Sequence, residues 1–373
     1  MLTQHFKLSH TTPGMDLNVT SFQFGPAGTR KVYIQASLHA DEIPGSLVIF
    51  FLKKHLKKLE AEQKLHCQVV LVPYCNPIGM SQQILQKSIG RHSFESGQNF
   101  NRLGKFYFLD HLIKKISAAD LSPTDASSNT AWIRRMIKEI LDQHIPESSI
   151  DELHHHLLSL SYDADIVLDL HCDEQSIMHL YTLPQLWQKG SKLARFINSQ
   201  CHLLSQDSGS HSFDEILSIP WLKLQEAFPK AAITLACFSA TIELRGQQDL
   251  CLETAENDAL AILSFLHEEN FIHLDNPKTP SNHIPEPHPL SGLSYVKAPQ
   301  SGIFVPTKKA GDWVDEHTII GHIVDPLNDT ITPIHSPIQG IIFSVALKPM
   351  AKLHQVIFSI SGAKDIGHTG LTL

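Results

Sequence analysis

The sequence predicts an α/β domain followed by a smaller β-rich domain. Over the first 270 residues, short apolar runs alternate with longer segments of helical periodicity, which is typical of a sheet packed by helices. Beyond a proline-rich stretch, short β-rich runs are separated by Gly and Pro. We therefore expect a large domain over 1–275, a linker over 276–289 and a β domain over 290–373.

Buried strands are expected where apolar residues form short unbroken runs. Five such runs stand in the first domain: Lys31–Leu38 (KVYIQASL), Gln68–Cys75 (QVVLVPYC), Asp165–Leu170 (DIVLDL), Ala231–Cys237 and Thr241–Leu244. Their separation by long segments predicts that helices connect most of them.

Helices are expected between these strands. Pro44 fits the first turn of a helix, because its missing N–H would have no partner there. Leucine then recurs at helical spacing up to Leu59, and a closing helix is marked by Leu260 and Leu266. Residues 103–160 carry further helical patterns mixed with a Ser/Thr/Asp-rich stretch. We interpret them as a helical insertion that partly covers the functional site.

The C-terminal part follows a proline-rich linker and contains an internal sequence repeat. Five prolines in 276–289 favour extended, semi-rigid chain and mark a domain boundary. Beyond them, APQSGIF at 298–304 is echoed by SPIQGIIF at 336–343. A repeat within about 80 residues predicts a small β-sandwich or barrel built from two similar halves.

Composition excludes several classes of function. The net charge of −8 argues against a nucleic-acid partner, because neutralising phosphates needs a surplus of Lys and Arg. No apolar run approaches the roughly 20 residues that span a bilayer. The opening MLTQHFKLSH lacks the pattern of a signal peptide, so we expect no membrane association and a cytoplasmic location. The six cysteines form no CxxC pair and are expected to be free thiols. The run 154–156 of three histidines is interpreted as a solvated loop or helix face.

Three residues form a candidate metal site. His39 and Glu42 stand in LHADE, directly after one expected strand, and His171 ends another in LDLHCDE. Strand ends on the carboxyl edge of an open α/β sheet are where such sites form. Two histidines and one glutamate leave a fourth position for water, which is the pattern of a catalytic zinc site. HxxE alone is a weak signal, because a loop histidine beside a surface glutamate explains it better, but the distant HCDE at a strand end and the residues discussed below reverse that preference.

Glu243, in ATIELRG, is the candidate general base. A carboxylate inside an apolar strand is costly unless it is paired or functional. A zinc hydrolase needs a base that takes a proton from water and returns it to the leaving amine. The alternative is a structural glutamate that pairs with Arg245 or Arg102.

Asn101 and Arg102, in QNFNR, are candidate substrate-binding residues. The guanidinium binds a carboxylate through a two-pronged fork, so this pair suits a substrate with a free carboxylate. Asn-Arg by itself is a common surface dipeptide.

Taken in order, HADE, NFNR, LDLHCDE and TIELRG resemble the succinylglutamate desuccinylase/aspartoacylase family, relatives of the zinc carboxypeptidases. The resemblance spans roughly residues 30–270. It implies a carboxypeptidase-like α/β/α fold with a mixed sheet, one zinc ion per chain and hydrolysis of an N-acyl amino acid. It assigns the residues discussed above to the same roles: the metal to His39, Glu42 and His171, the general base to Glu243, and the substrate carboxylate to Asn101 and Arg102.

The chain departs from this family pattern in three places. The family usually has Asp two residues before the motif Asn, whereas this chain has Asn99. A second substrate arginine is usual, and Arg91 is the nearest candidate. The insertion over 103–160 is longer than the family needs.

The C-terminal part resembles the barrel-sandwich domain of some members, which is similar to lipoyl and biotinyl carriers. No lysine stands at a suitable hairpin tip, so we expect no carrier role.

The sequence therefore predicts a zinc-dependent amidohydrolase that acts on a small N-acyl amino acid. Two alternatives remain: a metallocarboxypeptidase that acts on short peptides, and a binding protein with a vestigial site. The acyl group, the amino acid and assembly as a homo-oligomer stay open.

Overall fold

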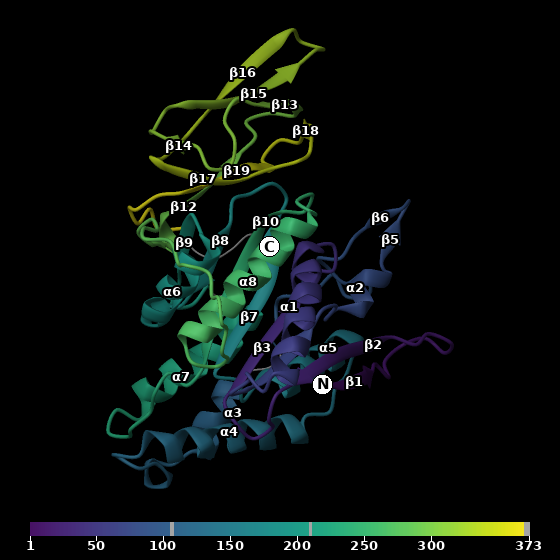
Figure 1. Cartoon of the computed structure of the whole chain (residues 1–373). Helices are drawn as coiled ribbons and strands as arrows, with labels where there is room; N and C mark the ends of the chain where they lie inside the picture. Colours follow the sequence, from purple (N-terminus) through teal and green to yellow (C-terminus); the bar gives the residue numbers. More distant parts are fainter. Residues whose placement is uncertain (105–107, 209–210, 369–373) are drawn as a thin grey trace.

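A nine-stranded mixed sheet forms the centre of the first domain (Figure 1). The computed structural model describes residues 1–104, 108–208 and 211–368. In spatial order the strands are β1 (Leu2–Lys7), β2 (Asn18–Phe24), β4 (Gln68–Val72), β3 (Lys31–Ala36), β7 (Ile166–Asp173), β10 (Phe238–Gly246), β8 (His179–Thr182), β9 (Cys201–Leu204) and β11 (His288–Pro289). The four central strands, from β4 to β10, run parallel.

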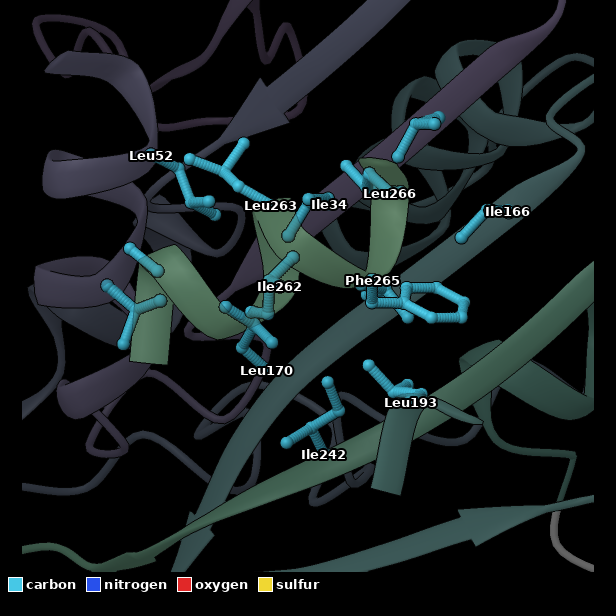
Figure 2. Close-up of a cluster of buried hydrophobic side chains, with 14 of the residues drawn as sticks. Ile34, Leu52, Ile166, Leu170, Leu193, Ile242, Ile262, Leu263, Phe265 and Leu266 are labelled. Atoms are coloured by element: carbon cyan, nitrogen blue, oxygen red, sulfur yellow. The ribbon is translucent and has the colours of Figure 1, made fainter. Parts of the chain in front are cut away.

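Helices cover both faces of this sheet. On one face lie α1 (Pro44–Ala61), α6 (Trp187–Ile197) and α8 (Leu252–Glu268). Figure 2 shows Ile34, Leu170 and Ile242 of the sheet meeting side chains of these three helices. The other face packs against α7 (Phe213–Ala227) and the helices of residues 108–161. Because β3 and β7 are covered on both sides, their residues are buried without alternation, and the α/β/α expectation is confirmed.

The individual elements agree with most of the expectations. The strands at 31, 68 and 165 form, α1 begins at Pro44, and α8 closes the domain. The strand expected at Ala231–Cys237 is wrong, because this segment is irregular. Its backbone bonds to neighbours outside the sheet: the Ala232 N–H donates to Ser122 O at 3.0 Å, and Gln225 Nε2 donates to Ile233 O at 2.6 Å.

Residues 108–161 are helical, as expected. They form α3 (Phe108–Lys115), the 3₁₀ turn η1 (Ala118–Asp120), α4 (Ala126–Gln143) and α5 (Ser149–Ser161). Asp125 and Ser148 cap α4 and α5 with their side chains. The interpretation of the histidine run as solvated is wrong for His154, which is buried and bonds through Nε2 to Phe100 O at 2.7 Å.

The C-terminal part forms two four-stranded antiparallel sheets that enclose a second core. One has the order β12 (Leu293–Lys297), β19 (Val356–Ser361), β17 (Gly340–Val345), β14 (Trp313–Val314). The other has β16 (Thr330–His335), β15 (Ile319–Asp325), β13 (Gly302–Pro306), β18 (Met350–Ala351). The two echoed segments lead into β13 and β17, one in each sheet. At Gly340 a Cβ atom would lie 2.2 Å from Ser361 O, so this strand pairing needs glycine.

The proline-rich segment lies against the first domain. His288 and Pro289 form β11, which pairs with β9 at the edge of the large sheet. Upstream, the Ser281 N–H donates to Arg195 O at 2.9 Å and His202 Nδ1 lies 3.0 Å from Pro285 O.

The shorter elements are α2 (Pro77–Ser81), β5 (Gln83–Ile84), β6 (Lys87–Ser88), η2 (Pro184–Leu186) and η3 (Leu290–Gly292). Each helix in the described part of the chain is too short or too polar to cross a bilayer.

Candidate functional site

Three predicted metal ligands converge at the carboxyl ends of the central strands. His39 and Glu42 lie in the loop between β3 and α1, and His171 lies near the end of β7. One ligand atom from each of the three lies within 4.8 Å of the others, and all three residues are buried. Among the described residues this is the one His/Cys/Asp/Glu group with such geometry.

The carboxylate of Glu42 lies between the two imidazoles. His39 Nδ1 lies 2.9 Å from Glu42 Oε1, and His171 Nδ1 lies 2.8 Å from Oε2. The far nitrogen of each ring has its own acceptor. His171 Nε2 lies 2.9 Å from Asp169 Oδ2, and His39 Nε2 lies 2.9 Å from Asn99 Oδ1. Both rings therefore present Nδ1 to the same carboxylate.

The pKa values of the two histidines are shifted in opposite directions. Burial lowers the pKa of His39 to about 4 and outweighs the nearby carboxylate of Glu42. For His171, burial also opposes the charge, but the carboxylates of Asp169 and Glu42 outweigh it and hold the pKa well above its usual value. Burial raises the pKa of Glu42, yet His39 and His171 together bring it well below the usual range. The set is thus built around a charged carboxylate.

Glu243 lies beside the ligand set. It pairs in register with His171 on the neighbouring parallel strand, so both side chains emerge on one face. Burial, and then the charge of Glu42, raise its pKa well above the usual value for a glutamate. Its Oε2 has no hydrogen-bond partner within the described residues. Arg245 pairs with Asp258 instead, so the structural alternative through that arginine fails.

The predicted substrate residues lie around the same cavity. Arg91 NH1 donates to Glu42 Oε1 at 3.1 Å and lies 3.3 Å from His39 Nδ1. A Cβ atom on the preceding Gly90 would lie 2.3 Å from Asp41 N, so glycine lets the Arg91 loop approach the metal loop.

Asn101 and Arg102 follow further along the same loop. The Phe213 N–H, at the start of α7, donates to Asn101 Oδ1 at 2.8 Å, so this amide oxygen is already engaged. Arg102 NH1 donates to Asn101 O at 2.7 Å. Both residues line the cavity with Arg91, although Asn101 also serves as a structural tie to α7.

The cavity has a volume of about 370 Å³. Its wall includes all seven predicted site residues: His39, Glu42, Arg91, Asn101, Arg102, His171 and Glu243. Sequence reasoning missed Asp214 and Glu215 at the start of α7 and Tyr295 and Phe343 of the C-terminal part. No described residue of 108–160 lines the cavity, although we expected that insertion to cover part of the site.

The C-terminal part is bonded directly to the segment that follows β7. The Val345 N–H donates to Gln175 O at 2.8 Å, and the Leu347 N–H donates to Glu174 Oε2 at 2.9 Å. Phe343 is buried in one apolar cluster with Leu203 of β9, and its ring centroid lies 5.0 Å from that of His179 of β8. The C-terminal sheet that contains β17 is therefore part of the cavity wall.

A comparison with known families identifies the first domain. A model of the succinylglutamate desuccinylase/aspartoacylase catalytic domain matches residues 28–268, about two thirds of the chain. The chain belongs to the succinylglutamate desuccinylase/aspartoacylase family. Membership in this family of deacylases supports hydrolase activity. A search of curated proteins finds no match.

Solved structures of similar fold extend over both parts of this family member. A protein of the same family from Shewanella amazonensis SB2B is 23% identical, covers 97% of this chain and 98% of its own, and has a TM-score of 0.83. One from Shewanella frigidimarina NCIMB 400 is 21% identical, covers 96% of each chain and has a TM-score of 0.84. The ectoine utilization protein EutE (DoeB) from Ruegeria pomeroyi is 11% identical, covers 96% and 94%, and has a TM-score of 0.65. These likenesses establish the fold.

Proposed function

We propose that the chain is a zinc-dependent amidohydrolase that removes a small acyl group from an N-acyl amino acid with a free carboxylate. The observation that carries the proposal is the buried convergence of His39, Glu42 and His171 in the wall of a cavity, with Glu243 beside them. Family membership supports the same class of reaction.

The donor chemistry fits zinc. Two imidazole nitrogens and one carboxylate are a common catalytic set for this ion and leave a position open for water. The Asn99 and Asp169 contacts turn Nδ1 of both rings toward Glu42, so electron-rich atoms converge where a cation would be favourable. Bound there, zinc would supply positive charge that acidifies water and polarises the acyl carbonyl oxygen.

Glu243 is proposed to carry the proton. Its raised pKa brings the carboxylate closer to the range in which it can both accept and donate a proton. Oε2, which has no partner among the described residues, would accept a proton from the attacking water. The same oxygen would then return the proton to the leaving nitrogen as the C–N bond breaks.

Arg102 is proposed to bind the free carboxylate of the substrate, with the Asn101 amide beside it. Arg91 lies nearer the ligand set and would stabilise negative charge that develops on the acyl oxygen.

The metallocarboxypeptidase alternative needs an open cleft for a peptide. The C-terminal wall, with Tyr295 and Phe343, favours a short substrate instead.

A hydrolysis screen on zinc-loaded protein tests the proposal. N-acetyl, N-succinyl and dipeptide substrates are compared with the wild type and with His171→Ala, and metal content is measured in both. We expect about one zinc per chain, loss of most of it in the variant, and preference for a short acyl group on one amino acid. Cleavage of longer peptides with equal efficiency would favour the carboxypeptidase, and wild-type protein that binds no zinc would refute the metal assignment.

A further inference from the structure

The two histidines of the ligand set differ in the partner of the ring nitrogen that faces away from Glu42. His171 Nε2 bonds to the carboxylate of Asp169 at 2.9 Å. His39 Nε2 bonds at the same distance to the amide oxygen of Asn99. Both partners are buried. The site therefore contains one charged and one neutral partner in equivalent positions.

The orientation of the Asn99 amide is fixed by a second contact. The backbone N–H of Asn101 lies 2.9 Å from Asn99 Oδ1, and a backbone N–H can only donate, so the oxygen must face it. The same oxygen faces His39 Nε2, which must then carry a hydrogen. In the neutral ring the lone pair is left on Nδ1, toward Glu42.

We infer that Asn99 is a positioning residue that holds His39 in the tautomer able to bind zinc through Nδ1, while leaving His39 the weaker of the two imidazole ligands. The inference rests on the proposed zinc site. A carboxylate partner raises the basicity of a metal-bound histidine and fixes its ring, and such partners influence metal affinity by about 10- to 100-fold. An amide fixes the ring in the same way without supplying negative charge.

The environment gives a reason for a neutral residue at this position. Glu42, Asp169 and Glu243 already place three carboxylates around the ligand set, with Arg91 as the nearest cation. The cost of the amide is visible too, because Asn99 Nδ2 is buried without a hydrogen-bond partner among the described residues. An aspartate would remove this unpaired donor but add a further negative charge beside these carboxylates. The amide therefore limits the charge of the site and makes zinc easier to release.

Zinc affinity measures this effect directly. The Kd for zinc is determined by competition with a chromophoric chelator for the wild type, Asn99→Asp and Asn99→Leu. We expect Asn99→Asp to bind zinc about tenfold more tightly or better, and Asn99→Leu to bind it about 10- to 100-fold more weakly. The rate at which excess chelator removes zinc should change in the same order.

The matched control is on the other histidine. Asp169→Asn gives His171 the same neutral partner and should weaken binding by about 10- to 100-fold. The double variant Asn99→Asp/Asp169→Asn exchanges the two partners and should return toward the wild-type Kd. A role that is only structural would not produce this recovery. Circular dichroism confirms that each variant is folded.

Folded Asn99→Asp that binds zinc no more tightly than the wild type would overturn the inference, as would a double variant weaker than both single ones. If Asn99→Leu does not fold, Asn99→Asp and Asp169→Asn still decide it. The inference would be refuted, and the proposed function left intact, if the wild type binds zinc and hydrolyses N-acyl amino acids but replacement of Asn99 does not change the Kd for zinc. Wild-type protein without zinc affinity would refute both.

Discussion

At the scale of single residues, Glu42 organises the site. Its Oε1 accepts from Arg91, and its Oε2 accepts from the Cys172 backbone N–H at 3.2 Å and faces His171. One carboxylate thus connects the loop after β3, the Arg91 loop and strand β7. A buried carboxylate with this many partners remains charged, which is the protonation state that a metal ligand needs.

Replacing Glu243 tests its role as the proton carrier. Glu243→Gln keeps the side-chain volume but cannot accept a proton, so we expect bound zinc and fold to persist while kcat falls by about 10²- to 10⁴-fold. Glu174→Gln is the control, since it also removes a carboxylate from the cavity wall but lies at the contact with the C-terminal part. If Glu243→Gln retains more than about a tenth of wild-type turnover, the proton carrier is another group.

Arg102 is tested by changing both the residue and the substrate. Removing one partner of a buried charge pair typically costs about 3–5 kcal/mol, which corresponds to a loss of about two to almost four orders of magnitude in kcat/KM. We expect this loss for Arg102→Ala with the free acid, and a similar loss when the wild type meets the methyl ester. Arg102→Lys should recover only part, because an ammonium cannot form the fork. Equal rates for acid and ester in the wild type would rule out the carboxylate contact.

Much of the candidate site can be predicted at this scale, because the ligands stand at strand ends in short motifs. The partners of the ligands were not predicted. Asp169 could have been found, since residues two apart on a strand share a face and His171 is two positions further on. Asn99 was noted only as a departure from the family pattern, without a role at the metal site. Its contact with His39 spans 60 residues and depends on how two loops fold together.

At the scale of elements, Glu152 of α5 anchors the segment that follows β1. Its carboxylate accepts from the Ser9 N–H at 2.8 Å, the Ser9 hydroxyl at 2.6 Å and the His10 N–H at 2.9 Å. Burial raises the pKa of Glu152, but these hydrogen bonds outweigh burial and lower it from 4.5 to about 2.

The Glu152 contacts should make stability depend on pH in the acidic range. A group whose pKa is lower in the folded state stabilises the fold above its unfolded pKa and loses this contribution as pH falls through the folded one. The free energy of unfolding of the wild type should therefore exceed that of Glu152→Gln by about 1–3 kcal/mol at neutral pH. The difference should shrink below pH 4.5 and vanish near pH 2. Glu226→Gln, on an exposed pair with Lys223, is the control and should show no such trend.

The element that sequence reasoning placed wrongly shows where periodicity fails. Residues 231–237 are apolar and short, as a buried strand would be, but their backbone groups bond to Ser122 and to side chains of α4 and α7. Burial explains their apolar character in either case. Only the hydrogen-bond partners distinguish the two, and those come from distant elements.

At the scale of the whole molecule, the C-terminal part completes the cavity, and Phe343 belongs to the apolar cluster that joins it to the first domain. Phe343→Ala should cost about 3–5 kcal/mol at this contact. We expect a raised KM and faster proteolytic cleavage within residues 276–289. Phe50→Ala, at a phenylalanine that is 58% exposed, is the control and should change neither. Unchanged KM and protease resistance in Phe343→Ala would mean that the contact has no role in substrate binding.

The α/β fold of the first domain and the β fold of the second could be predicted from the spacing of apolar residues, because that spacing depends on burial within each element. How they are placed relative to each other could not. The contacts at Gln175 and Glu174 are made by backbone N–H groups, which every residue except proline possesses. The residue types at Val345 and Leu347 therefore do not predict these two hydrogen bonds.

The pairing of β11 with β9 has a consequence for synthesis of the protein. The ribosome makes β9 first, and its open edge has no neighbour until His288 and Pro289 emerge, roughly 4–17 seconds later at about 5–20 residues per second. An open strand edge is a template for pairing with other chains. During this interval the unpaired edge of β9 can pair with other chains and lead to aggregation. In a protein truncated before residue 288 this edge would stay unpaired.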